Sequence, residues 1–323
     1  MAEKEVTLDF TIAIPTYNGA SRLPKLLARL QQQKNVVEIS WEIIIIDNDS
    51  QDNTAKIIKS YQNNWQQNYP LRYFLETKQG AAFARLRGGK EAKGKLIGFI
   101  DDDVLPDYNW LAEAWKFGCD RPHIGAYSGS IHGEFESPPP ENFDKIAGFL
   151  AIRKYGNQAQ LFDPPNLRLP PTASLVVNRQ AWQESAPINP VLIGRVGGKM
   201  LGGEDYEMLI HIHSAGWEIW YNPAMNSYHQ IPSWRLERDY LLALAYHSGL
   251  PTCYLRSLSA LPWQKPLIAI KIILGSLRRM FLISLKYQGR VKTDLVAACE
   301  WQFFWGNILS VFYYILNWSR KST

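Results

Sequence analysis

Three consecutive aspartates, Asp101, Asp102 and Asp103, directly follow the apolar run of residues 96–100. Adjacent carboxylates repel one another, and a carboxylate beside buried chain loses hydration, so the triplet needs a compensating partner. A divalent cation such as Mg²⁺ or Mn²⁺ would supply one, because these ions prefer oxygen ligands. In an extended segment Asp101 and Asp103 would point to one side and Asp102 to the other. The alternative is a hydrated turn that binds nothing.

A second acidic pair, Glu204 and Asp205, lies in the glycine-containing stretch GGEDYEM at residues 202–208. Glycines let a loop fold closely over a ligand, and Asp205 could then face a pocket as a general base. The alternative is a helix cap, because a carboxylate at a helix start is stabilised by the dipole. The local sequence leaves both interpretations open.

A histidine with two arginines forms the third chemical pattern, in YHQIPSWRLERDYL at residues 228–241. His229 follows a predicted strand and could add an imidazole ligand, while Arg235 and Arg238 could bind phosphate. The alternative is a surface histidine followed by a solvated helix face.

These residues must be positioned by an alternation of short apolar runs and amphipathic segments in the first hundred residues. Residues 42–47 (EIIIID) form a continuous apolar run that ends in a carboxylate, as expected of a buried parallel strand. The pattern predicts βαβ units with a mainly parallel sheet. The expected strands are 10–14, 42–47, 71–75 and 96–100, and the expected helices are 21–31, 52–61 and 81–93.

Three of the predicted strands end in polar residues. These ends read PTYNG at 15–19, DNDS at 47–50 and DDD at 101–103. Because ligands bind at the carboxyl ends of strands in such sheets, we expect the three ends to share one site.

The pattern changes after residue 126. Further strands are expected at 126–135, 174–177 and 217–223, and helices rich in leucine and aromatic residues follow Tyr240. We therefore expect a catalytic domain over residues 1–240 and a helical, amphipathic extension over 241–323.

Composition favours a folded chain in a reducing compartment. Of 323 residues, 46% are hydrophobic and 20% charged, so a packed core is expected, and the net charge of +5 suits an anionic substrate or membrane surface without requiring either. The three cysteines are far apart and form neither a disulfide framework nor a metal-ligand spacing. The N-terminus lacks the apolar core of a signal peptide, so we expect the first domain to be cytoplasmic.

Taken in order, four motifs resemble those of glycosyltransferase family 2 over about residues 9–235. They are IPTYNG (14–19), IIIIDNDSQDNT (43–54), GAAFARLRGGKEAKGKLIGFIDDD (80–103) and GGEDYEM (202–208). Residues 215–223 and 228–241 look most like the cyanobacterial members assigned to hormogonium polysaccharide synthesis. The resemblance implies the type A glycosyltransferase fold, an α/β domain around a mostly parallel mixed sheet flanked by helices, here with a C-terminal helical extension.

The resemblance also implies a donor site. The turn that begins at Pro15 would lie against the nucleoside, with Thr16 and Tyr17 contacting base and ribose. Asp47 would accept a hydrogen bond from uracil or another base, and Arg85 would contact the nucleotide.

The family pattern assigns roles to the acidic motifs as well. It gives Asp103 to the metal, Mn²⁺ or Mg²⁺, and Asp101 or Asp102 to the ribose and donor sugar. Asp205 matches the catalytic base, and His229 falls where relatives supply a further metal or diphosphate contact.

Two stretches depart from the family pattern. Leu86–Arg87 replaces the usual asparagine after Arg85, which puts an asparagine-specific contact in doubt. PTAS at 171–174 matches poorly and is left out of the predicted site.

The predicted function is inverting transfer of a sugar from a nucleotide-diphosphate donor such as a UDP-sugar to a hydroxyl of a glycan or lipid-linked acceptor in exopolysaccharide synthesis. No nucleic-acid partner is expected. One alternative is a noncatalytic nucleotide- or carbohydrate-binding scaffold, which should have lost Asp101, Asp103 or Asp205. Another is a nucleotidyltransferase, which should carry a phosphate loop rich in glycine and lysine where IPTYNG stands.

Two apolar segments near the C-terminus, 266–285 and 303–318, are interrupted by charged or polar residues. A spanning helix needs about 20 apolar residues, and neither segment is a convincing span. Both suit amphipathic helices at a membrane interface, so we expect peripheral contact with the cytoplasmic face of the plasma membrane. The alternatives are packing on the catalytic domain or an oligomer interface.

Overall fold

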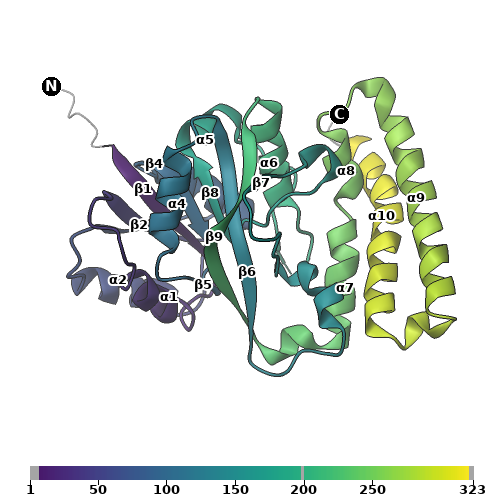
Figure 1. Cartoon of the computed structure of the whole chain (residues 1–323), viewed down its shortest axis with the longest axis horizontal. Coiled ribbons are helices and arrows are strands. Elements are labelled where there is room, and N and C mark those ends of the chain that lie inside the picture. The colour runs from purple at the N-terminus through teal and green to yellow at the C-terminus, as the bar shows by residue number, and fades with distance from the viewer. Residues whose placement is uncertain (1–6, 198–199, 320–323) are drawn as a thin grey trace.

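The computed structural model describes residues 7–197 and 200–319, which form a mixed sheet with helices on both faces and a helical hairpin at one side (Figure 1). The nine strands formed by these residues run in the order β3-β2-β1-β4-β8-β6-β9-β5, with β7 paired to β9. The strands are β1 (Leu8–Thr16), β2 (Trp41–Asp47), β3 (Leu71–Leu75), β4 (Gly94–Ile100), β5 (Val104–Pro106), β6 (Ile124–Phe135), β7 (Gln160–Leu161), β8 (Ser174–Asn178) and β9 (Glu218–Ile231). The helices are α1 (Leu23–Leu30), α2 (Thr54–Asn63), α3 (Ala81–Glu91), α4 (Trp110–Cys119), α5 (Arg179–Ser185), α6 (Glu204–Ser214), α7 (Arg238–Gly249), α8 (Thr252–Ser257), α9 (Lys265–Lys286) and α10 (Leu295–Ser319).

The first four strands of the sheet, β3, β2, β1 and β4, are parallel, as the sequence predicts. Thr16 at the end of β1 aligns with Asp47 at the end of β2. In the same way, Ala13 of β1 aligns with Phe99 of β4. The polar segments that follow these strands therefore lie along one edge of the sheet.

The second half of the sheet mixes directions. Strand β8 runs antiparallel to both β4 and β6, whereas β6 and β9 are parallel. The prediction that the last strand ends at residue 223 is wrong, because β9 continues to Ile231. The pairing with β6 shifts register between Tyr221 and Asn226 and then resumes, so His229 lies within the strand and pairs with Val104 of β5.

Side-chain alternation along β1 divides the core into two layers. Phe10 and Ile12 contribute to the cluster that includes the leucines of α1 and Trp110 of α4. Ala13 belongs to the cluster on the other face, which contains Phe99 and residues of α5 and α6. Helix α1 packs with one face because Leu23, Leu26, Leu27 and Leu30 recur at helical spacing and are all buried.

Helix α3 lies very close to α5. A Cβ atom at Gly89 would fall 2.0 Å from Nε1 of Trp182, so only glycine allows this approach. The close packing holds α3 against the sheet and directs the buried side chain of Arg85 toward the strand ends.

The C-terminal helices form their own layer beside the sheet. Residues of α7 and α10, including Leu241, Leu244, Val296 and Cys299, share a core cluster, and α10 also packs against α9. Across the described residues, none of the helices has both the length and the apolarity needed to cross a bilayer. The domain boundary at residues 240/241 stays a prediction.

Strand β2 carries a carboxylate inside the sheet. Glu42 is fully buried, and it accepts hydrogen bonds from the Thr11 hydroxyl at 2.9 Å and from Arg72 Nη1 at 2.8 Å. A buried carboxylate is tolerated only where such partners replace water.

Replacing Arg72 with methionine should therefore destabilise the fold by about 3 kcal/mol, because Glu42 would stay buried without its cationic partner. The double variant E42Q/R72M should recover a large part of this loss. Urea unfolding of the two variants and the parent chain measures both effects. Equal stability of the single and double variants would contradict the assignment.

Candidate functional site

A cavity of about 810 Å³ opens at the carboxyl edge of the parallel strands. Nearly all of the side chains predicted from the sequence to bind donor, metal or proton line it. They are Pro15, Thr16, Tyr17, Arg85, Asp101, Asp102, Asp103, Asp205 and His229.

The three aspartates form a turn between β4 and β5 rather than an extended segment. The backbone N–H of Val104 donates to the carbonyl of Asp101 at 3.0 Å and closes this turn. The expectation that Asp101 and Asp103 point to one side is therefore wrong, because it assumed strand alternation. Each of the three carboxylates has its own set of partners.

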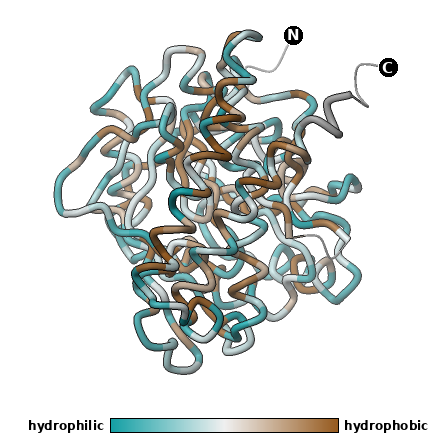
Figure 2. Tube along the Cα trace, turned by 90° about the vertical axis from the view of Figure 1, so that its right-hand side faces the viewer, coloured by the Kyte–Doolittle hydropathy of each residue, from teal (hydrophilic) through white to brown (hydrophobic). Residues whose placement is uncertain are grey.

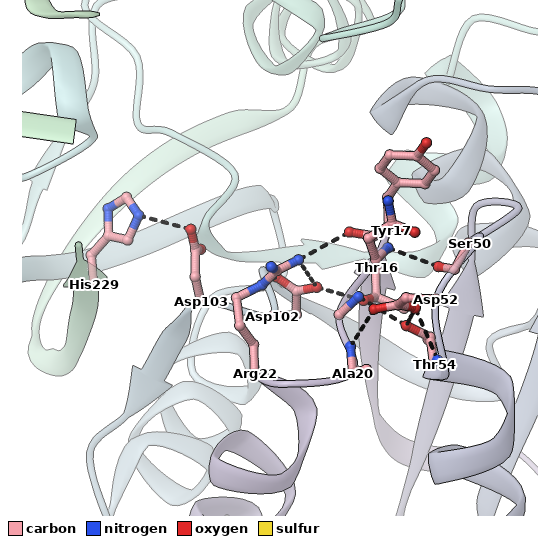
Figure 3. A network of polar contacts seen from close by, with 12 residues as sticks. Thr16, Tyr17, Ala20, Arg22, Ser50, Asp52, Thr54, Asp102, Asp103 and His229 are labelled. Atoms are coloured by element: carbon pink, nitrogen blue, oxygen red, sulfur yellow. Dashed lines mark hydrogen bonds and ion pairs between the residues drawn. The ribbon is translucent and has the colours of Figure 1, made fainter. Parts of the chain in front are cut away.

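Asp102 is held by the N-terminal strand and helix. Its carboxylate accepts a hydrogen bond from the Thr16 hydroxyl at 2.5 Å and two from Arg22, at 2.7 and 2.9 Å (Figure 3). Arg22 also donates to the carbonyl of Tyr17. A Cβ at Gly19 would lie 2.0 Å from the Thr16 hydroxyl oxygen, so glycine in the IPTYNG turn leaves room for this bond.

Arg85 joins the two acidic motifs. Its guanidinium lies 3.0 Å from Asp101 Oδ1, 3.3 Å from Glu204 Oε1 and 3.1 Å from Asp205 Oδ1. Burial opposes a charged guanidinium, but Asp205, Asp101 and Glu204 outweigh it and raise the pKa of Arg85. One buried cation thus holds carboxylates from two distant parts of the chain.

Asp205 is oriented by Thr172. The backbone N–H of Thr172 donates to Asp205 Oδ2 at 3.1 Å, and its hydroxyl donates to Oδ1. Thr172 belongs to the PTAS stretch that the predicted site left out. It reaches the site because β8 is antiparallel to β4, so the start of β8 lies beside Asp101, whose N–H donates to the carbonyl of Ala173.

The acidic pair at the start of α6 has two different environments. Burial and the neighbouring Asp205 raise the pKa of Glu204 to about 7, although Arg85 acts in the opposite direction. Oε2 of Glu204 is buried without a hydrogen-bond partner, which also disfavours its ionised form. Asp205 instead accepts bonds from Thr172 and faces Arg85. Glu204 is therefore the carboxyl of this pair suited to hold a proton, and Asp205 the one suited to accept one.

Asp103 faces the far side of the cavity. Its Oδ2 lies 3.2 Å from His229 Nε2 and 3.0 Å from Arg235 Nη1 (Figure 3 shows the histidine contact). Burial alone would raise the pKa of Asp103, but the charges of His229 and Arg235 hold it well below its usual range. Nδ1 of His229 lies 2.8 Å from the Leu150 carbonyl. The other ring nitrogen, Nε2, faces Asp103 and Arg235 and is therefore the atom of His229 positioned to bind a metal.

The donor set suits a divalent cation that the substrate helps to bind. Within residues 7–197 and 200–319, no group of three or more His, Cys, Asp or Glu side chains converges to hold a metal ion. One carboxylate and one imidazole, those of Asp103 and His229, nevertheless fit Mn²⁺ or Mg²⁺ when diphosphate oxygens supply further ligands. Arg235 contacts both side chains, so its guanidinium occupies the position that a metal ion would take between them.

Asp47 does not line the cavity. It is buried, with its oxygens engaged by the backbone N–H of Ser50 at 2.9 Å and the Tyr73 hydroxyl at 3.1 Å. Because Asp47 is buried, a base could contact it only if the residues around it moved. Asn48 and Gln79 line the cavity beside it and were not singled out, because an amide in a polar loop gives no distinct sequence signal.

A family model fits this arrangement: the model for Glycosyl transferase family 2 matches residues 11–180, more than half of the chain. The chain belongs to this family. The nucleotidyltransferase alternative is thereby removed. The chain is similar to validoxylamine A glucosyltransferase of Streptomyces hygroscopicus subsp. jinggangensis, with 25% identity over 64% of this chain and 51% of that protein. It spans about half or less of the length of this and other curated relatives.

Two solved structures show that the chain has the type A fold, as the sequence predicts. A mannosyltransferase from Pyrobaculum calidifontis, in complex with GDP-Man and Mn²⁺, has a TM-score of 0.59 and 17% identity, covering 95% of this chain and 88% of that one. GalNAc-T7 with UDP, GalNAc and Mn²⁺ has a TM-score of 0.55 and 17% identity, covering 83% of this chain and 54% of that one.

The environment of Glu204 predicts a pH-dependent stability. Its pKa is raised from 4.5 to about 7 in the folded chain, so the folded state binds more protons than the unfolded state between these values. Stability should therefore fall as pH rises through this window. The variant E204Q has no such carboxyl and should not show this loss. Its free energy of unfolding should therefore rise by about 1–3 kcal/mol relative to that of the parent chain as the pH increases from 4.5 to 7.

Urea unfolding of both chains at several pH values measures the difference. The exposed Glu38 provides the matched control, because E38Q removes a glutamate without changing a buried group. If E204Q and E38Q showed the same pH dependence, Glu204 would not carry the raised pKa.

Proposed function

We propose that the chain is an inverting glycosyltransferase that moves a sugar from a nucleotide-diphosphate donor, a UDP-sugar, to an acceptor hydroxyl. The observation that carries the proposal is the division of the carboxylates within one cavity. Asp103 lies with His229 on one side, whereas Asp205 lies with Thr172 on another. A site for the departing diphosphate and a separate base are what a direct displacement requires.

The donor would occupy the end of the cavity formed by the strand ends. Thr16, Tyr17 and Pro15 would lie against the nucleoside, and Asp101 and Asp102 would hold ribose and sugar hydroxyls. Asp205 would remove the proton of the attacking hydroxyl. Because the attack comes from the face opposite the leaving group, the anomeric configuration would invert without an enzyme nucleophile.

Asp103 and His229 would hold Mn²⁺ or Mg²⁺ together with the diphosphate. A divalent cation at this position orients the diphosphate and stabilises the charge that develops on the departing nucleotide. Arg235, released from Asp103, would remain close enough to contact a phosphate oxygen through its guanidinium.

The acceptor would occupy the end of the cavity walled by the C-terminal helices. The helices contribute Leu244, Pro251, Leu255 and Phe303 to this wall, and Phe149, Leu150 and Met200 from earlier segments complete its apolar lining. Arg153 and Arg195 line the cavity as well. Apolar walls beside cations support a lipid-linked acceptor, with a glycan acceptor as the alternative.

A lipid-linked acceptor would place the reaction at the cytoplasmic face of the plasma membrane. The product would then enter exopolysaccharide synthesis, as proposed for the family members assigned to hormogonium polysaccharide. Contact through the C-terminal helices, with the membrane or with a second copy, belongs to the same proposal.

Removing the base should separate binding from transfer. D205N should keep its affinity for the donor, because Asp205 contacts the acceptor side, and lose transfer by about 10²–10⁴-fold. A panel of nucleotide-sugars with Mn²⁺ identifies the donor by thermal stabilisation of the parent chain, and product formation with that donor measures transfer. Normal turnover by D205N would refute the assignment of the base. Absence of stabilisation by every donor would favour the noncatalytic scaffold.

Removing the metal-binding carboxylate should have a different signature. D103N should lose Mn²⁺-dependent donor binding by calorimetry, because one of the two protein ligands is gone. D120N, which changes an exposed aspartate at the end of α4, should bind as the parent chain does. Unchanged Mn²⁺-dependent binding in D103N would place the cation elsewhere.

A further inference from the structure

Helix α9 exposes a continuous apolar face. Phe281 is 63% exposed and Leu274 is 62% exposed, which is unusual for such large side chains. The exposed apolar side chains recur at intervals of three or four residues and so form one stripe along the helix. They are Leu267, Ile270, Leu274, Leu277, Phe281 and Leu285. Figure 2 views the molecule from the side on which α9 lies in Figure 1.

The stripe is not the face that packs α9 onto the protein. That role belongs to the opposite face, where Ile272, Met280 and Ile283 are buried. Ile272 shares a cluster with Val311 of α10 and Cys253 of α8. Since α9 is already anchored through this face, the exposed stripe adds nothing to the fold and costs solubility. It therefore indicates a surface that is covered when the protein works.

The charges beside the stripe identify what covers it. Lys271, Arg278, Arg279 and Lys286 are exposed on α9, and the helix contains no aspartate or glutamate. The absence of acidic residues extends over residues 240–293, which hold eight lysines and arginines in a chain with 35 basic and 30 acidic residues in total. A surface that is both apolar and exclusively basic complements one that is apolar and anionic.

A second copy of the chain is a poor complement, because a symmetric contact would bring two basic faces together. An anionic bilayer supplies acyl chains for the stripe and phosphate groups for the basic residues. Trp263, which is 65% exposed just before α9, is of the type found at the boundary between headgroups and acyl chains. No described helix can span a bilayer, so α9 would lie in the plane of the interface.

We propose that the exposed face of α9 docks the protein on an anionic phospholipid surface, with the stripe among the acyl chains and the basic residues at the headgroups. Helix α10 packs on the inner face of α9 and contributes Phe303 to the cavity wall. A single helix thus separates the docking face from the acceptor end of the cavity. That last relation rests on the proposed function, whereas the membrane contact does not.

Flotation of the full chain with vesicles tests the docking face. The parent chain should float with vesicles containing phosphatidylglycerol and bind vesicles of pure phosphatidylcholine about tenfold less, and salt should weaken the binding. L274S/F281S should lose binding to the anionic vesicles by about tenfold, because two side chains of the stripe no longer enter the acyl region. R278E/R279E should bind the two vesicle types equally weakly.

The matched control changes exposed apolar side chains elsewhere. Val37 and Ile188 are 98% and 88% exposed and lie far from α9 in sequence, so V37S/I188S should float like the parent chain. Thermal unfolding shows that each variant is folded, and it does not depend on transfer activity. Equal flotation of L274S/F281S and the parent chain would overturn the proposal. The proposal would also be overturned if the parent chain did not bind anionic vesicles. The same holds if sedimentation showed a dimer of the parent chain that is lost in L274S/F281S.

Discussion

One buried guanidinium holds the site together. Arg85 lies on a helix packed tightly against α5, and it contacts Asp101 after β4 together with Glu204 and Asp205 at the start of α6. It can neutralise only one of these three negative charges, so the remainder must be met by protons, hydrogen bonds or a bound cation. The raised pKa of Glu204, the two bonds from Thr172 to Asp205 and the separate partners of Asp103 all fit that imbalance.

A large part of this arrangement could be predicted from the sequence. Short apolar runs followed by polar ends at 15–19, 47–50 and 101–103 indicated parallel strands whose carboxyl ends meet, because strand direction and polarity determine where ligands bind in such sheets. Family motifs added the chemical roles of Asp205 and His229, which lie in the same cavity. The C-terminal helices were also foreseeable from the leucine and aromatic residues that follow Tyr240.

The remaining features depend on direction and register, which side-chain patterns do not encode. An apolar run such as SLVV predicts a strand, but not that β8 runs antiparallel and brings Thr172 to Asp205. Alternation failed for the aspartates because a turn closed by Val104 replaces the extended conformation. The partnership of Arg22 with Asp102, eighty positions apart, arises only in three dimensions.

The aspartate turn has a mechanical consequence as well. Strands β4 and β5 are separated in the sheet by β8, β6 and β9, yet only Asp101–Asp103 connects them along the chain. In a flat sheet the four strand spacings would require about 19 Å. The connection spans at most about 14 Å. The sheet must therefore curl until its last strand returns toward its middle, with the turn as a covalent tie between the two. Asp101 is fixed to the centre of the sheet and Asp103 to its far edge, so the degree of curl sets the distance between the two halves of the site.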